Sequence, residues 1–169
     1  RHIDGTTWTN ALTADAGLLS GNYTDVAITS TGVVYATISS DASTQDGIFR
    51  STDGVTWTAI TQTAQGFPST FNRIVIVIAP SNQNIVYFLA ETPGSGVSGH
   101  SLWVYDASTN GWINRSTNIP SFGDPVCNFD SQSSYDLVIK VKPDNQNVVL
   151  IGGTNLYRST DGFVTAQNV

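Results

Sequence analysis

Apolar residues in this chain gather in short runs rich in Val, Ile, Tyr and Phe, bounded by Gly, Pro, Asn, Asp or Ser. Three longer stretches share the pattern, at residues 23–39, 71–91 and 135–153. Each has two apolar runs around a polar turn, which in the second and third is a P-x-N-Q-N tract starting at Pro80 or Pro143. β-Branched and aromatic residues favour strands, whereas proline and asparagine favour turns. Each stretch is therefore predicted to form two strands.

A third and a fourth apolar segment follow each predicted strand pair. The third segments are "DGIFRSTD", "HSLWVYDA" and "NLYRSTD", and the fourth are "TWTAIT", "GWINRS" and "VTAQNV". Four short antiparallel strands that recur about every 50 residues are typical of β-propeller blades. We therefore predict an all-β fold, a β-propeller segment of four-stranded antiparallel blades.

The repeats predict how the chain is divided. Residues 1–14 match only a fourth strand and would be the outer strand of a preceding blade, while blades are predicted at 22–62, 70–117 and 135–169, the last incomplete. Closed propellers need about four to eight blades. We expect the chain to be part of a larger propeller, with the remaining blades of the same protein or another protein chain as its partner.

The turn between the third and fourth strands carries a recurring motif, most complete at Ser51, Asp53, Gly54, Thr56 and Trp57. This motif resembles the Asp-box, S-x-D-x-G-x-T-W, of sialidase-type, sortilin-type and xyloglucanase-type propellers and of secreted bacterial repeat proteins, with one residue fewer between Asp and Trp. Less complete copies comprise Ser159, Asp161 and Gly162; Asp4, Gly5, Thr7 and Trp8; and Asp106, Gly111 and Trp112.

The chemistry of the motif predicts a structural role. A short Asp or Ser side chain accepts hydrogen bonds from nearby amides, Gly tolerates positive φ, and an indole can cover the hairpin. The resemblance places the motif on the face away from the usual ligand mouth. We therefore interpret Asp53 and Asp161 as structural residues; the alternative is a metal or ligand role.

Charge and composition exclude several classes of function. The net charge is −6 and the seven Lys and Arg residues are dispersed, which disfavours nucleic acid and anionic membranes as partners. The most apolar run, residues 74–80, is too short to span a bilayer. The single cysteine, Cys127, excludes an internal disulfide, and we expect its thiol to be buried. No cofactor or metal site is predicted, since Asp41 and Asp46 match no EF-hand spacing.

Candidate functional residues lie in the longest loops. Segments 39–47, 63–70, 91–100 and 118–134 should gather on one propeller face, where they form either a ligand site or ordinary surface. Glu91, the only Glu, together with Asp124 and Asp130, is the candidate catalytic set, because glycosidases use two carboxylates. A sialidase-like site is disfavoured, since Arg50 and Arg158 belong to the repeated strand pattern and are expected to pack beside aromatics.

Three functional hypotheses follow. The leading one is a noncatalytic interaction or display module of a large secreted or cell-surface protein, because every strong signal in the sequence is architectural. The first alternative is a fragment of a glycan-active hydrolase, xyloglucanase-like or sialidase-like, with catalytic residues partly outside this chain. The second is a sortilin-like peptide-binding propeller. A glycan is the ligand class considered for the first two, and the extracellular location follows from resemblance to exported bacterial repeat proteins.

Overall fold

The computed structural model of the chain describes residues 11–12, 24–40, 45–123 and 126–166. The strands are β1 (Thr24–Ile28), β2 (Val34–Ile38), β3 (Gly47–Ser51), β4 (Thr58–Ala59), β5 (Ile74–Ile78), β6 (Ile85–Glu91), β7 (His100–Asp106), β8 (Gly111–Asn114), β9 (Val138–Lys142), β10 (Asn145–Gly152) and β11 (Leu156–Ser159). Among the described residues the helical segments are two single 3-10 turns, η1 (Thr63–Gln65) and η2 (Ser116–Asn118).

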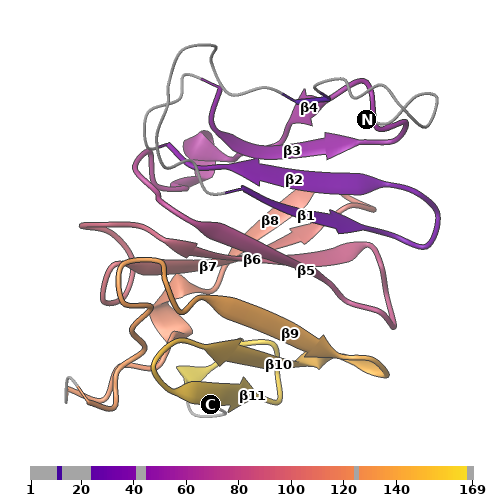
Figure 1. Cartoon of the computed structure of the whole chain (residues 1–169). Coiled ribbons are helices and arrows are strands. Elements are labelled where there is room, and N and C mark those ends of the chain that lie inside the picture. The colour runs from indigo at the N-terminus through magenta and orange to yellow at the C-terminus, as the bar shows by residue number, and fades with distance from the viewer. Residues whose placement is uncertain (1–10, 13–23, 41–44, 124–125, 167–169) are drawn as a thin grey trace.

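The strands form three antiparallel sheets in sequence order (Figure 1). The first sheet has the order β1-β2-β3-β4, the second β5-β6-β7-β8, and the third β11-β10-β9. The predicted all-β fold of successive propeller blades is therefore confirmed. The fourth strand predicted for the third blade is not formed at 164–166, and 167–169 lie outside the described residues. The strand predicted within 1–14 also lies outside them, apart from residues 11 and 12.

The second sheet is sandwiched between the other two because its strands are apolar on both faces. On β5, Ile74 and Ile76 belong to the cluster shared with the first sheet, whereas Val75 belongs to the cluster shared with the third. Successive side chains on a strand point to opposite faces, so an unbroken apolar run suits a strand covered on both sides. The "IVIVI" run thus forms a strand that is covered on both faces, although it lies at the edge of its own sheet.

Two kinds of contact join the first sheet to the second. Tyr35 on β2 packs edge-on against Phe88 and Tyr105, with ring centroids 6.4 and 6.2 Å apart. Beside the rings, Asp25 Oδ2 accepts a hydrogen bond from Ile76 N at 2.8 Å, and Thr37 Oγ1 donates to Ile74 O at 3.0 Å. These bonds satisfy polar groups at the sheet junction, where unpaired ones would be costly.

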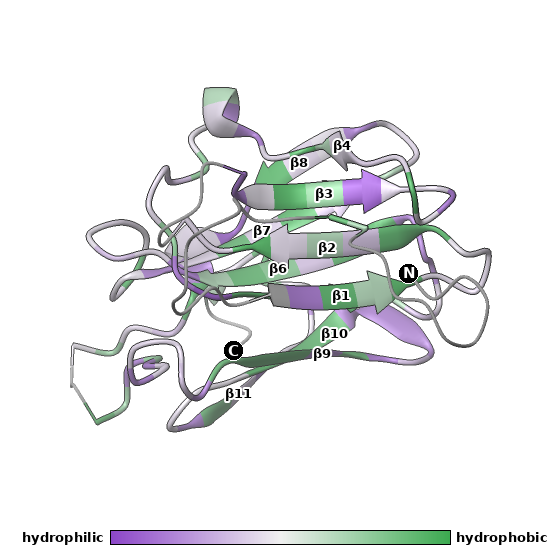
Figure 2. Cartoon of the chain, turned by 45° about the horizontal axis from the view of Figure 1, so that its top comes forward, coloured by the Kyte–Doolittle hydropathy of each residue, from purple (hydrophilic) through white to green (hydrophobic). Residues whose placement is uncertain are grey.

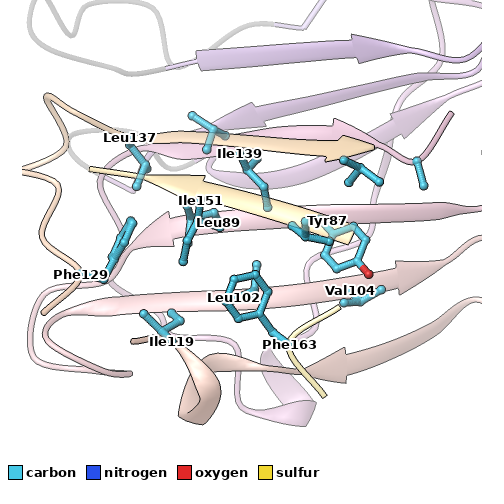
Figure 3. Close-up of a cluster of buried hydrophobic side chains, with 14 residues drawn as sticks. Tyr87, Leu89, Leu102, Val104, Ile119, Phe129, Leu137, Ile139, Ile151 and Phe163 are labelled. Carbon is cyan, nitrogen blue, oxygen red and sulfur yellow. The ribbon is translucent and has the colours of Figure 1, made fainter. Parts of the chain in front are cut away.

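The junction between the second and third sheets is an apolar core (Figure 3). Leu89 and Leu102 of the second sheet face Ile139 and Ile151 of the third, and Phe163 from the segment after β11 completes the cluster. All five side chains are at most 2% exposed. The hydrophobic effect therefore stabilises the packing of neighbouring blades.

The connections between strands divide between two faces. The β1–β2, β5–β6 and β9–β10 turns lie at the right of Figure 1, whereas the β6–β7 loop and the segment leading into β9 lie at the left. We call the side with the β1–β2, β5–β6 and β9–β10 turns the turn face, because it also carries the turns between third and fourth strands. We call the opposite side, with the β6–β7 loop and the segment leading into β9, the loop face. Hydrophobic residues concentrate in the strands and most connections are polar or neutral (Figure 2).

Candidate functional site on the loop face

The first turn that resembles an Asp-box, at residues 51–57 on the turn face, is held together by its own side chains. Asp53 Oδ1 accepts hydrogen bonds from Val55 N at 2.8 Å and Thr56 N at 2.7 Å. Ser51 Oγ donates to Asp53 Oδ1 and accepts from Gly54 N at 2.8 Å, while Gly54 has φ +69°. The Thr56 and Val55 amides stabilise the carboxylate and lower the pKa of Asp53 to about 2.

The third copy uses the same residues in a shifted register. Ser159 Oγ accepts from Phe163 N at 2.8 Å, and Thr165 Oγ1 donates to Asp161 Oδ2 at 2.8 Å. Phe163 has φ +60° and is completely buried in the core between the second and third sheets. Unlike the first turn, this one therefore also fills the blade junction.

Of the other residues matched to the motif, those that the structure describes include Asp106, Trp57 and Trp112. Asp106 Oδ1 accepts from Ser108 Oγ at 2.6 Å and Ser108 N at 2.9 Å, and these bonds, the side-chain one foremost, lower the pKa of Asp106. Trp57 is half-buried, with an indole Nε1 that has no hydrogen-bond partner, and Trp112 lies in the core with the first sheet. The copy predicted at Asp4, Gly5 and Trp8 lies outside the described residues.

Two of the three candidate catalytic carboxylates are described, and both make hydrogen bonds within the protein. Glu91, half-buried at the end of β6, accepts through Oε2 from Asn72 Nδ2 at 2.9 Å and from the Ser134 hydroxyl. Asp130 is exposed, and its Oδ1 accepts from Gln132 N at 2.8 Å. Asp124 lies outside the described residues.

Near Glu91 and Asp130 the structure places a buried histidine, His100. His100 Nε2 lies 2.7 Å from Ser131 Oγ, and its ring packs edge-on against Phe129 with centroids 4.8 Å apart. His100 Nδ1 is buried without a hydrogen-bond partner. Burial lowers the pKa of His100, while the charges of Glu91 and Asp130 oppose that shift. His100 and Ser131 are 31 residues apart in the sequence, so no local motif predicts their contact.

The loop that supplies Ser131 has an unusual backbone. Gln132, Ser133 and Ser134 have φ values of +49°, +57° and +71°, in the left-handed region that residues other than glycine rarely adopt. Such conformations cost about 1–3 kcal/mol each and persist where the surroundings hold them. Here the buried Ser134 bonds to Glu91, and Arg73 Nη1 donates to Ser134 O at 3.2 Å. The strained turn is thus fixed to the second sheet.

This arrangement limits the chemistry that the candidate set can perform. Ser131 and Ser134 are fully buried, so neither hydroxyl is open to a substrate. What remains accessible is a shallow hollow of about 250 Å³ lined by Ser98, Asn128, Phe129 and Asp130. The loop face therefore presents a polar surface above a hydrogen-bonded support.

A second hollow on the loop face lies between the η1 segment, the β6–β7 loop and η2. It measures about 230 Å³, and its lining includes Ser101, Trp103, Asn114 and Thr117. Trp103 is only 1% exposed, and its indole Nε1 has no hydrogen-bond partner. The lining is uncharged and combines hydroxyl and amide groups with an aromatic ring.

Two other predictions concern individual side chains. The expectation that Cys127 is buried is wrong: the residue is exposed, and the contact with Tyr157 is made by its backbone carbonyl, which accepts a hydrogen bond from Tyr157 Oη at 2.8 Å. Of the two loop acids considered for calcium, Asp41 lies outside the described residues, and partial burial raises the pKa of Asp46.

Comparison with known proteins identifies the fold. No family model and no curated protein matches the chain. Among solved structures, it is similar to a GH74 enzyme of Niastella koreensis at 20% identity with a TM-score of 0.58. The likeness establishes the fold. It covers 95% of this chain and 24% of the enzyme, so the chain spans about a quarter of that protein's length. Within the described residues, no helix is long and apolar enough to cross a membrane.

Proposed function

We propose that this chain is a noncatalytic interaction module, a β-propeller segment of a large secreted or cell-surface protein that presents its loop face to a ligand. The observation that carries the proposal is the hydrogen bonding of the candidate carboxylates. Glu91 accepts from Asn72 and Ser134, and Asp130 accepts from its own turn. A glycosidase instead needs two carboxyl groups directed at the substrate bond.

A glycan is the ligand class we propose for the loop face. The hollow beside Trp103 is uncharged, and its exposed Ser95, Asn114 and Thr117 offer hydroxyl and amide groups that suit the hydroxyls of a sugar ring. Fold likeness to a GH74 enzyme is compatible with this class but does not assign it.

Binding and hydrolysis can be measured on the same samples. Affinity electrophoresis in gels containing xyloglucan, other plant polysaccharides or host glycans should show retardation, while release of reducing ends stays at the level of a heat-denatured control. Thr117→Ala, in the hollow beside Trp103, should weaken retardation, whereas Thr52→Ala, exposed on the turn face, should not. Release of reducing ends above the heat-denatured control would contradict the proposal. So would equal loss of retardation in Thr52→Ala and Thr117→Ala.

The second candidate function is a fragment of a glycan-active hydrolase. It is favoured by the likeness to a GH74 enzyme and by the position of Glu91 at a strand end on the loop face. In that case reducing ends would be released, and Glu91→Gln would abolish their release while leaving retardation intact. Asp130→Asn tests the second carboxylate in the same assay.

We also propose that further blades cover the open faces of the first and third sheets. On β1, Val26 and Ile28 are 61% and 63% exposed on the side opposite the second sheet. On the third sheet, Val138 and Leu156 are 45% and 70% exposed, likewise on the outward side. Exposed apolar surface of this kind typically marks an interaction site.

A further inference from the structure

A hollow of about 240 Å³ lies on the turn face, where the first and second sheets meet. The β1–β2 turn lines one side with Thr31, and the β5–β6 turn lines the other with Gln83 and Asn84. Tyr35 and Arg50, neighbours on β2 and β3, also line it. This hollow is separate from the loop face and takes no part in the proposed function.

Arg50 brings an unpaired positive charge to this hollow. Its side chain is half-buried, and the guanidinium Nε is buried without a hydrogen-bond partner. Within the part of the chain that the structure describes, the only ion pair joins Lys142 to Asp144. A half-buried guanidinium without an ion-pair partner among the described residues would gain charge-assisted hydrogen bonds from an incoming anion.

The acids of the neighbouring turns, Asp53 and Asp106, form no ion pair with Arg50. Asp53 directs Oδ1 at the Val55 and Thr56 amides, and Asp106 directs Oδ1 at Ser108. The lining of the hollow itself contains no carboxylate. Arg50 is therefore the one charged side chain in the lining of this hollow, although the whole chain carries a net charge of −6.

Amide groups supply further donors beside the guanidinium. Gln83 Oε1 accepts from Ser30 N at 2.7 Å and from Ser30 Oγ at 3.1 Å, which orients the amide and leaves its NH₂ group available. The Asn84 side chain lines the same wall, and Thr31 Oγ1 lies 3.0 Å from Thr29 Oγ1. These groups suit hydroxyl or carboxylate oxygens.

We propose that this hollow binds an acidic sugar of the hexuronic acid class, with its carboxylate on Arg50 and its ring hydroxyls toward Gln83, Asn84 and Thr31. Arginine pairs with carboxylates through two parallel hydrogen bonds, which gives both affinity and orientation. The hollow, of about 240 Å³, is larger than a carboxylate alone would fill.

The repeat provides a matched control for Arg50. Arg158 occupies the same position in the third repeat, one residue before the Asp-box serine, but its side chain is exposed and lines none of the hollows described above. Replacing Arg158 removes the same charge from the chain without touching the proposed site. A nonspecific electrostatic effect would therefore appear in both variants.

The test is a titration of the isotope-labelled chain with D-glucuronate, followed by NMR. Saturable shifts should include the Arg50 Nε–H and the side-chain amides of Gln83 and Asn84. Arg50→Gln should weaken binding by about tenfold or more, because it removes a charged hydrogen bond. Arg158→Gln should bind within about twofold of the unchanged chain, as expected for a distant surface charge.

Two further ligands test the chemistry of the site. D-Glucose should bind at least about tenfold more weakly than glucuronate, since it lacks the carboxylate, and acetate should also bind more weakly because it lacks the ring. Equal affinity for glucose, or for acetate, would overturn the assignment of an acidic sugar. So would glucuronate shifts that are absent, or that survive in Arg50→Gln. If Arg50→Gln does not fold, Arg50→Lys keeps the charge but loses the paired geometry, and unchanged affinity there would equally contradict the proposal.

Discussion

At the scale of single residues, the pKa values of Asp53 and His100 are both lowered, but for different physical reasons. Local amide hydrogen bonds favour the charged form of Asp53. Desolvation favours the neutral form of His100, with Glu91 and Asp130 acting against it. Each shift makes folding depend on pH, because the folded and unfolded states then bind protons differently.

Asp53 should stabilise the fold at neutral pH and less so in acid. Its pKa is lowered from 3.8 to about 2, so its contribution is complete above about pH 4 and is lost as the pH falls toward 2. Asp53→Ala should lower the thermal midpoint at pH 7 and differ little from the unchanged chain near pH 2. Thr52→Ala, exposed in the same turn, is the control. A deficit in Asp53→Ala that persists unchanged in acid would contradict this account.

His100 should destabilise the fold as the pH falls. Because its pKa is lowered from 6.5, the unfolded state takes up a proton before the folded state does. Stability linked to His100 is therefore full above about pH 6.5 and declines below it. Denaturant unfolding between pH 7.5 and 5 should show a steeper loss for the unchanged chain than for His100→Gln. Parallel pH curves for the two proteins would show that His100 is not desolvated.

At the scale of structural elements, the two Asp-box-like turns combine a shared local geometry with different surroundings. Gly54 and Gly162 both have φ +69°. Around Gly54 a Cβ atom would meet nothing within 4 Å, whereas at Gly162 it would lie 2.6 Å from Tyr87 Oη. Burial in this junction raises the pKa of Tyr87 to about 12. The third turn is thus part of the packing between blades, and the first is a surface hairpin.

Alanine at these two glycines should separate backbone strain from steric conflict. Gly54→Ala should cost about 1 kcal/mol, since only the left-handed conformation opposes it. Gly162→Ala should cost about 2–4 kcal/mol, because overpacking against Tyr87 is added to the same strain. Gly162→Ala in a Tyr87→Phe background should recover part of the loss. Equal costs at the two glycines in denaturant unfolding would show that the Tyr87 contact is unimportant.

At the scale of the whole molecule, the arc of blades leaves one sheet face open at each end. Val26 and Ile28 alternate with Ala27, which packs toward the second sheet, so the two exposed side chains share the outward face. On the third sheet, Lys140 and Lys142 alternate with the buried Ile139 and Val141. One open face is mainly apolar, and the other mixes apolar residues with cations.

The isolated chain should therefore associate at high concentration. Light scattering should detect species larger than the 18.0 kDa monomer, and Val26→Lys combined with Ile28→Lys should reduce them. Val55→Lys is the matched control, because Val55 is 50% exposed on the turn face, away from both sheet faces. A monomer at every concentration, or equal effects of the double variant and the control, would count against coverage by further blades.

The sequence by itself determined most of the described strands, their order and the local hydrogen bonding of the Asp-box-like turns, but not the absence of a fourth strand at 164–166. These features depend on residues close together in the chain. Asp53 bonds to amides two and three residues away, and five consecutive apolar residues in β5 predict a strand that is covered on both faces. The repeats reinforced each reading, since three copies of one pattern restrict the fold more than a single copy does.

Only the tertiary structure decided which side chains meet across blades and which face solvent. His100 joins Ser131 across 31 residues, Ser30 joins Gln83 across 53, and Cys127 lies exposed against expectation. Sheet packing sets such contacts, and the same strand pattern can place Arg50 at a junction and its counterpart Arg158 in solvent. Local pattern fixes conformation, whereas burial and charge environment depend on the neighbouring blade.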